Sequence, residues 1–252
     1  MAEPLLRVEH VSKRFGGLLA LDRVSFSADV GRITALIGPN GAGKTTLFSI
    51  IAGSLPPSQG RIVYDGVNIG GEPPHRRARR GIARTFQIAQ PFVGLTVREN
   101  IAVGTHLLRP ARADALAAAG DVAHEVGLGD LLDRPAATLT VAGRKRLELA
   151  RALAIAPRLL LLDEVLAGLN PSEIRDMVPV ISAIRNRGIT IVMVEHVMQA
   201  VMNLAEHVFV LSEGRVIAEG PPDAIAADPR VVEAYLGRDA AGRMMAAGKA
   251  NA

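Results

Sequence analysis

The sequence contains no cysteine, so it can form neither a disulfide framework nor a thiolate metal site. This composition is consistent with a reducing compartment. Aromatic residues make up only 3% of the chain and do not alternate with its basic residues, so a stacking platform for nucleic-acid bases is not expected. No run of 18 or more uncharged apolar residues occurs, so no segment is predicted to span a membrane.

Length and composition predict a folded protein with a sizeable core. The 252 residues are 49% hydrophobic, which is too apolar for a disordered chain. Residues 1–7 contain no basic segment followed by an apolar core, so we expect no signal peptide. Any work at a membrane would then require another chain to hold this one there.

The positive charge is concentrated in two short clusters. The net charge is +4, and arginines gather at 75–80 and at 144–146. A solvated face is the simplest interpretation of such clusters. Contact with anionic lipid headgroups is an alternative, whereas nucleic acid is disfavoured by the lack of interleaved aromatic residues.

The most informative segment is the glycine-rich run at 38–46. Its spacing, G-x-x-x-x-G-K-[ST], is that of a phosphate-binding P-loop. The apolar run 33–37 predicts a buried strand before it, and a helix is predicted to start at 45. Backbone N–H groups would face phosphate oxygens, Lys44 would contact the β- and γ-phosphates, and the Thr45 hydroxyl would bind Mg²⁺. The predicted nucleotide-binding residues here are Gly38, Pro39, Asn40, Gly41, Ala42, Gly43, Lys44, Thr45 and Thr46.

The remaining pattern predicts strands first, a helical middle, and then alternating strands and helices. Unbroken apolar runs at 159–162 and 189–194 are typical of a parallel sheet covered on both faces. Alanine and leucine at helical spacing predict a helix over 112–126. The other expected strands are 5–11, 24–28, 61–64, 82–86, 208–211 and 215–219, with a hairpin turn at Asp65-Gly66.

Polar residues follow two of the apolar strands. Asp163 and Glu164 end the first of them, where an acid can hold Mg²⁺ and a second acid can polarise a water molecule. A loop start or helix cap is the alternative for two such acids. His196 follows the second strand at the same edge, where α/β proteins bind ligands. It could bond a γ-phosphate oxygen or be a structural histidine.

These motifs, with two more, occur in the order found in ABC transporter nucleotide-binding domains, which the chain resembles over about residues 1–236. The five are the P-loop, Gln87 in Thr85-Phe86-Gln87, the loop 139–143, the Asp163-Glu164 strand and His196. Finer segments are similar to the ATPase subunits of branched-chain amino acid importers, namely 13–18, 84–87, 147–151, 167–171 and the pair Glu195-His196.

The resemblance implies a fold and a domain division. The expected fold class is α/β, a P-loop NTPase (RecA-like) core with an antiparallel β ribbon and an inserted α-helical subdomain. The nucleotide-binding domain would cover 1–236, with its core at 1–87 and 157–236 and the helical subdomain at 88–156. The tail 237–252, rich in glycine and alanine, is expected to be poorly ordered.

The resemblance also assigns roles to individual residues. Phe15 matches the aromatic residue that stacks on adenine, and Gln87 the glutamine that contacts Mg²⁺ or the attacking water and senses the membrane partner. Asp163 matches the metal-binding acid, Glu164 the catalytic base and His196 the switch histidine. ATP and Mg²⁺ are the implied cofactors.

The loop 139–143 departs from the family's usual Leu-Ser-Gly-Gly-Gln. Thr140 keeps a hydroxyl, and Thr140, Ala142 and Gly143 are expected to bind nucleotide from the N-terminus of a helix. The family forms a head-to-head dimer, so this loop would close over ATP held by the other subunit. Val141 would be strained if its position needs a positive φ, and the cluster 144–146 would lie unfavourably in the first helical turn.

The function implied is that of an ATP-hydrolysing subunit that powers uptake of branched-chain or hydrophobic amino acids. Its partners would be membrane permease subunits, a second ATP-binding subunit in a homo- or heterodimer, and an extracytoplasmic binding protein, with no nucleic acid. It would lie peripherally on the cytoplasmic face of the cell membrane. Segment 87–95 is predicted to form one wall of a groove for a permease helix, although Phe92 and Leu95 could instead pack onto the core.

Three other functions are compatible with part of this pattern. An ATPase of lipopolysaccharide export has similar motifs and a short middle segment. Soluble ABC ATPases of translation or DNA repair carry two tandem modules or a long coiled coil, and this chain has one P-loop and no sustained heptads. A generic P-loop kinase would lack the ordered Gln87, loop 139–143 and His196. The cargo is not encoded here, because the ATPase does not touch it.

Overall fold

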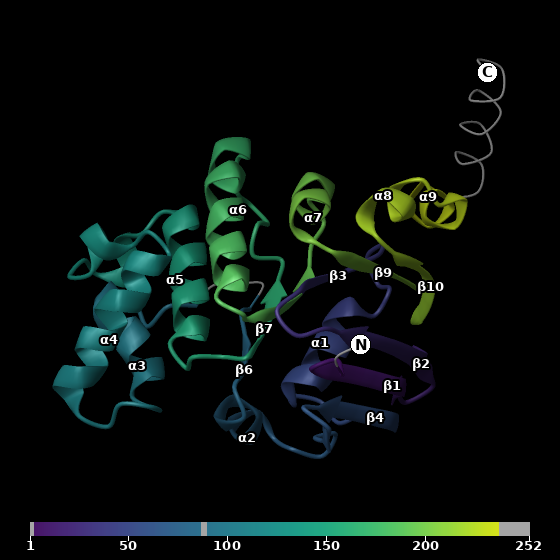
Figure 1. Cartoon of the computed structure of the whole chain (residues 1–252), viewed down its shortest axis with the longest axis horizontal. Coiled ribbons are helices and arrows are strands. Elements are labelled where there is room, and N and C mark those ends of the chain that lie inside the picture. Colours follow the sequence, from purple (N-terminus) through teal and green to yellow (C-terminus); the bar gives the residue numbers. More distant parts are fainter. Residues whose placement is uncertain (1–2, 87–89, 237–252) are drawn as a thin grey trace.

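A six-stranded, mostly parallel sheet forms the centre of the structure, a computed structural model that describes residues 3–86 and 90–236 (Figure 1). The strand order is β10-β9-β3-β8-β7-β6, and only the β9–β10 pair is antiparallel. In that order the strands are Arg215–Gly220, His207–Ser212, Ile33–Ile37, Thr190–Val194, Leu159–Asp163 and Ile82–Arg84. The predicted α/β class is confirmed.

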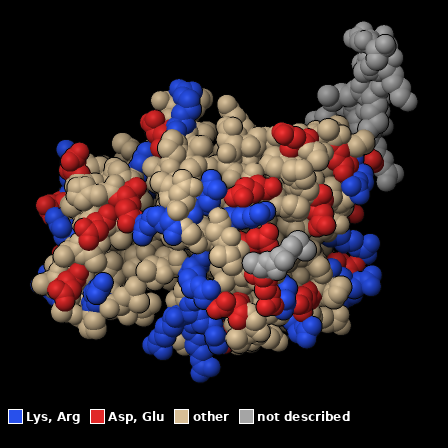
Figure 2. Space-filling view, viewed as in Figure 1, with Lys and Arg blue, Asp and Glu red and all other residues tan. Residues whose placement is uncertain are grey.

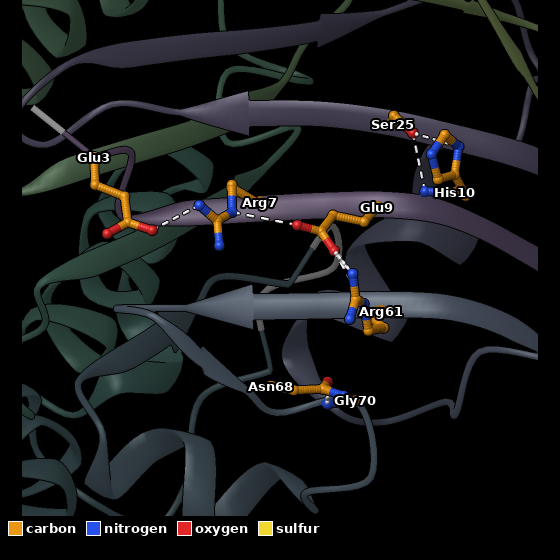
Figure 3. A network of polar contacts seen from close by, with 8 residues as sticks. All are labelled: Glu3, Arg7, Glu9, His10, Ser25, Arg61, Asn68 and Gly70. Atoms are coloured by element: carbon orange, nitrogen blue, oxygen red, sulfur yellow. Dashed lines mark hydrogen bonds and ion pairs between the residues drawn. The ribbon is translucent and has the colours of Figure 1, made fainter. Parts of the chain in front are cut away.

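A second, antiparallel sheet packs beside the first, in the order β2-β1-β4-β5. Its strands are Leu18–Ala28, Leu6–Phe15, Gln59–Tyr64 and Val67–Asn68. Asp65 and Gly66 have φ values of 49° and 74° and connect β4 to β5 as a two-residue turn, as predicted. Along the surface of this sheet, Arg7 bridges Glu3 and Glu9, and Glu9 pairs with Arg61 on β4 (Figure 3). These exposed ion pairs contribute little to stability.

The helices cover both faces of the parallel sheet. Helix α1 lies between the two sheets, and α6 and α7 lie on the opposite side of the parallel sheet (Figure 1). Helices α3, α4 and α5, with two short 3₁₀ turns at Gly129–Leu131 and Ala136–Thr138, form the helical part of the chain between β6 and β7. The α-helices are Lys44–Ala52, Pro74–Arg79, Val97–Thr105, Arg112–Glu125, Val141–Leu153, Pro171–Asn186, Met198–Leu204, Pro222–Ala226 and Pro229–Leu236, numbered α1 to α9.

The apolar strands are buried on both faces, as their unbroken runs predicted. In β7, Leu159 and Leu161 belong to the core shared with α1, whereas Leu160 and Leu162 belong to the core shared with α5 and α6. Helix α4 matches the predicted helix 112–126 to within one residue. The division into a core and a helical subdomain, with its boundary at 88–156, stays a prediction, and the tail 237–252 lies outside the described residues.

One member of the basic cluster 75–80 has a structural role that contradicts the solvated-face interpretation. Arg77 is only 1% exposed. Its guanidinium donates to the carbonyl oxygens of Ile50 and Ile51, both at 2.6 Å, and to that of Ile69 at 2.6 Å. A cation at the C-terminal end of α1 satisfies carbonyls that the helix leaves unpaired. Arg77 therefore anchors the far end of the helix that begins at the P-loop.

Candidate active site

The P-loop connects the end of β3 to the start of α1, in the strand–loop–helix context that the sequence predicted. Two of its glycines are required by close contacts. A Cβ on Gly38 would lie 2.0 Å from the carbonyl oxygen of Leu211, and one on Gly43, which has φ 102°, would lie 2.8 Å from that of Ala20. Only glycine lets the loop pass this close to its neighbours.

Lys44, the first residue of α1, is buried and points back into the loop. Its Nζ donates to the carbonyl oxygens of Gly38 at 2.7 Å and Pro39 at 2.9 Å. Burial lowers the pKa of Lys44, while the nearby carboxylates of Glu164 and Asp163 oppose this shift. The ammonium is thus held at the centre of the loop, where phosphate oxygens can replace the two carbonyls.

An open cavity of about 750 Å³ lies over the P-loop. Phe15, at the end of β1, forms part of its wall with a side chain that is 44% exposed. An exposed ring beside a phosphate loop can stack on a nucleobase. The lining residues are Phe15, Leu18, Leu19, Ala20, Asn40, Gly41, Ala42, Gly43, Lys44, Thr45, Thr46, Glu164, His196, Glu213 and Gly214.

Glu164 and His196 meet at the edge of this cavity. Glu164 follows β7 and His196 follows β8, and the Nε2 of His196 lies 2.7 Å from Oε1 of Glu164. Glu164 has a φ of 49°, which is uncommon for a residue other than glycine. The 2.7 Å distance puts the two predicted catalytic side chains in direct contact.

Asp163 is held by a buried arginine. Its Oδ2 accepts from Nη2 of Arg84 at 2.7 Å, and both side chains are largely buried. The backbone N–H of Asp163 donates to Oγ1 of Thr85 at 3.0 Å. Arg84 and Thr85 come from the adjacent strand β6 and the residue after it, so this neighbouring segment fixes Asp163 on both sides.

The residues near Asp163 fit a magnesium ion. A cavity of about 510 Å³ is lined by both Asp163 and Thr45. No group of three or more His, Cys, Asp or Glu residues able to hold a metal occurs in the described part of the chain. Mg²⁺ in nucleotide sites uses few protein ligands, because phosphate oxygens and waters supply the rest. The carboxylate of Asp163 and the hydroxyl of Thr45 are therefore sufficient protein ligands for Mg²⁺.

The loop 139–143 begins helix α5. Thr140 is the N-cap, and its Oγ1 accepts from the N–H of Gly143 at 3.1 Å, as expected. Val141 is the first helical residue and is 54% exposed. The strain considered for Val141 does not arise, because its φ is not positive. The loop thus presents the free N–H groups of a helix start.

The basic cluster 144–146 is arranged differently from the prediction. Helix α5 starts at Val141, so only Arg144 falls in the first turn. Lys145 is buried at 6% exposure and points inward, and Arg146 donates to the carbonyl oxygen of Val126 at 2.6 Å. The prediction that all three cations oppose the helix dipole is therefore wrong for Lys145 and Arg146.

The structure brings most of the predicted site together. Residues 40–46 of the P-loop line one cavity with Phe15, Glu164 and His196, and Asp163 lines the adjacent one with Thr45. Gly38 and Pro39 line neither cavity, and their carbonyl oxygens accept from Lys44. Thr140, Ala142 and Gly143 line neither cavity. Gln87 lies outside the described residues.

Two charged residues of the site were not predicted from the sequence. Arg84 contacts Asp163, and Lys145 contacts the backbone of Glu164. Lys145 could have been noticed, because it falls at helical spacing with the buried Leu149 and Ala152. Arg84 depends on the pairing of β6 with β7, which places it opposite Leu161.

Comparison with known proteins identifies the family. The ABC transporter family profile matches residues 21–167, and the profile of the branched-chain amino acid ATP-binding cassette transporters matches residues 215–241. The chain is similar to two solved structures: a nucleotide-free ATP-binding cassette from an ABC transporter (TM-score 0.86) and the ADP conformation of the cassette MJ1267 (TM-score 0.84). Each is 32% identical, and each match covers 94% of this chain and 100% of the other.

The chain belongs to the ABC transporter family, as one of its ATP-binding, ATP-hydrolysing subunits. Within the family it is 38% identical to the high-affinity branched-chain amino acid transport ATP-binding protein BraF of Pseudomonas aeruginosa, over 94% of this chain and 99% of BraF. It is 37% identical to LivG of Escherichia coli K12, with the same coverage of both chains. Among the described residues, no helix is long and apolar enough to cross a membrane.

Proposed function

We propose that this ATPase powers the uptake of branched-chain or other hydrophobic amino acids through a membrane permease. The main support for this proposal is the similarity to BraF and LivG over nearly the whole of each chain. The cavity that is lined by the P-loop, Glu164 and His196 agrees with it. The names of these relatives specify branched-chain amino acid transport, which favours amino acids over lipopolysaccharide as the cargo.

The predicted site residues divide the proposed reaction among them. Phe15 stacks on the adenine, and the loop N–H groups and Lys44 bind the phosphates. Thr45 and Asp163 would hold Mg²⁺, which would neutralise phosphate charge. Glu164 accepts a proton from the attacking water. His196, in contact with Glu164 at 2.7 Å, orients that carboxylate or bonds a γ-phosphate oxygen.

The proposal includes a head-to-head dimer in which each of two ATP-binding subunits completes the site of the other. Thr140 and the start of α5 line neither cavity of their own subunit, and Val141 is exposed. A helix N-terminus with free N–H groups is suited to bind an anion. In a head-to-head dimer this N-terminus would close over ATP bound to the partner's P-loop.

The permease would dock between the helical part of the chain and β6. Cavities of about 270 and 510 Å³ lie side by side there and share Arg84, Phe86, Glu148 and Arg151. Phe92 lines the second cavity and is 46% exposed, so it does not pack into the core. The first cavity is also lined by Pro74 and Ala78 of α2. Figure 2 shows Lys and Arg side chains gathered over α2, which would place a basic surface beside the docked permease on the cytoplasmic side of the membrane.

Reconstitution tests this function. The protein is purified with its co-expressed permease and placed in liposomes that contain ATP, with the binding protein and radiolabelled leucine outside. We expect leucine uptake that depends on ATP, with no uptake of an unrelated sugar. Uptake of neither solute, or equal uptake of both, would argue against the proposed cargo.

The matched control is Glu164→Gln, which keeps the size and polarity of the side chain but removes the base. We expect the variant to bind ATP with unchanged affinity, to hydrolyse it ~10²-fold more slowly or worse, and to accumulate as a dimer during gel filtration with ATP. Hydrolysis at the wild-type rate would remove Glu164 from the base role.

A further inference from the structure

A buried ammonium from helix α5 reaches the backbone of the proposed base. The Nζ of Lys145 donates to the carbonyl oxygen of Glu164 at 3.0 Å, and Lys145 is only 6% exposed. Lys145 is the fifth residue of α5, the helix that starts at the Thr140 cap. The start of α5 and the residue after β7 are therefore joined by one side chain.

The backbone at Glu164 is fixed from several directions. Its N–H donates to the carbonyl oxygen of Val194 at 2.9 Å, and its carbonyl oxygen also accepts from the N–H of Ala167 at 3.1 Å. The φ of 49° is a conformation that residues other than glycine keep only when their surroundings enforce it. Among the described residues, Lys145 is the one charged side chain that bonds the carbonyl oxygen of Glu164.

A buried carboxyl, Glu195, is the acid that most opposes the lowering of the Lys145 pKa by burial. Glu195, fully buried beside His196, accepts from the N–H of Leu166 at 2.9 Å through Oε1. Its Oε2 has no hydrogen-bond partner in the described part of the chain. Burial lowers the pKa of Lys145, and the nearby acids Glu195, Glu164, Glu148 and Asp163 oppose this shift. Lys145 thus bonds the backbone of Glu164, and the Glu195 carboxylate interacts with the backbone N–H of His196.

We propose that Lys145 is a positioning residue for Glu164. Its ammonium holds the carbonyl oxygen of Glu164 and balances Glu195, which keeps the Glu164 carboxylate directed at the cavity and at His196. Lys145 lines neither cavity, so we assign it a role through Glu164 and not a direct contact with ATP. The inference rests on the proposed role of Glu164 as the base.

The test uses Lys145→Met, which keeps the length of the side chain and removes its charge. We expect kcat for ATP hydrolysis to fall about tenfold or more, because small displacements of a catalytic group are costly, while the Kd for a fluorescent ATP analogue stays within about twofold. Lys145→Arg, which retains a donor and the charge, should recover most of kcat. Arg146→Met is the matched control, since it removes a charge from the next position of α5 without facing Glu164; its kcat should stay within about twofold.

A double variant separates positioning from simple charge balance. At pH 8, where Glu195 is charged, Lys145→Met removes a nearby cation and is expected to lower the Tm, whereas Lys145→Met/Glu195→Gln removes both charges and should restore the Tm. On our inference kcat of the double variant stays low, because the contact to Glu164 is still missing. Recovery of kcat together with the Tm would overturn the inference, as would a Lys145→Met enzyme with wild-type kcat.

The double variant also covers the case in which Lys145→Met does not fold. The Glu164→Gln enzyme distinguishes a wrong assignment of the base from a wrong assignment of the positioning residue. If that variant keeps turning over ATP, the proposed base is wrong; if it stops while Lys145→Met does not, only the positioning role fails.

Discussion

At the scale of the residue, the buried carboxyl of Glu195 departs far from its ordinary chemistry. Burial raises the pKa of Glu195 to about 7, and the negative charge of Glu164 adds to this shift. The N–H groups of Leu166 and His196 and the ammonium of Lys145 act in the opposite direction. The carboxyl therefore changes its charge near neutral pH in the folded protein and near pH 4.5 in the unfolded chain.

This difference predicts a pH-dependent stability. Between about pH 4.5 and 7 the folded state binds the proton more tightly than the unfolded state, so the free energy of unfolding falls as the pH rises through this window. Glu195→Gln removes the titration and keeps an acceptor for Leu166. We expect the variant to gain roughly 2 kcal/mol over wild type between pH 5.5 and pH 8. Urea unfolding of both proteins at the two pH values measures this, and a difference that does not change with pH would contradict it.

The sequence predicted the residues that line the two cavities better than it predicted the residues that support them. Lys44, Asp163, Glu164 and His196 belong to motifs whose spacing reflects the chemistry of phosphate binding, and the structure places three of them in one cavity and Asp163 in the next. The contact of Arg84 with Asp163 was not predictable, because it depends on which strands are neighbours and in what register. Such supports become visible only once the sheet order is known.

At the scale of the element, the first turn of α5 is the best place to test the proposed contact between subunits. Val141 is exposed, and an acid in the first turn of a helix is favourable for the helix itself. Val141→Asp should therefore leave the fold and ATP binding to the subunit's own P-loop intact. A carboxylate there would repel the phosphates of ATP on the other subunit, so we expect dimer formation with ATP to be lost and ATPase activity to fall at least about tenfold.

The neutral isostere Val141→Asn is the control, and it should retain dimer formation. Gel filtration with ATP in the Glu164→Gln background reports the dimer for both variants. If Val141→Asp weakens ATP binding by the monomer, then the start of α5 serves its own subunit instead. If both variants dimerise like the parent, the start of α5 is not in the interface.

Element boundaries show what sequence patterns can and cannot resolve. The predicted strand 24–28 is only the second half of β2, which begins at Leu18, and β1 extends four residues beyond the predicted 5–11. The pairing of these strands is interrupted by register shifts near Val11, and His10 has a φ of 50°. Bulges of this kind break the two-residue alternation on which the prediction depends. Unbroken apolar strands such as β7 carry no such irregularity and were predicted to within one residue.

At the scale of the whole molecule, one cavity is lined both by Asp163 of the catalytic site and by Phe92 of the proposed docking surface. Arg84 binds Asp163 and also lines the cavity that Phe92 borders. The main chain of Phe92 is fixed by the buried Asn100, whose Oδ1 accepts from the N–H of Phe92 at 2.8 Å. The side chain is thus presented on a rigid support, with the Arg151 guanidinium 4.9 Å from its ring centroid.

The Phe92→Asp variant tests this surface. The ring is 46% exposed and belongs to neither core cluster, so its loss should not unfold the protein. An aspartate would remove the apolar ring that a permease helix would contact. It would also place a charge on this surface, and burying a charge under a docked helix is costly even beside Arg151. We expect circular dichroism and basal ATPase activity within about twofold of wild type, and co-purification with the permease to be lost. Val93→Asp is the matched control: Val93 is 68% exposed and lines neither cavity, so that variant should still bind the permease. Retention of the permease by Phe92→Asp, loss of its fold, or equal loss of binding in both variants would show that Phe92 does not form the docking surface.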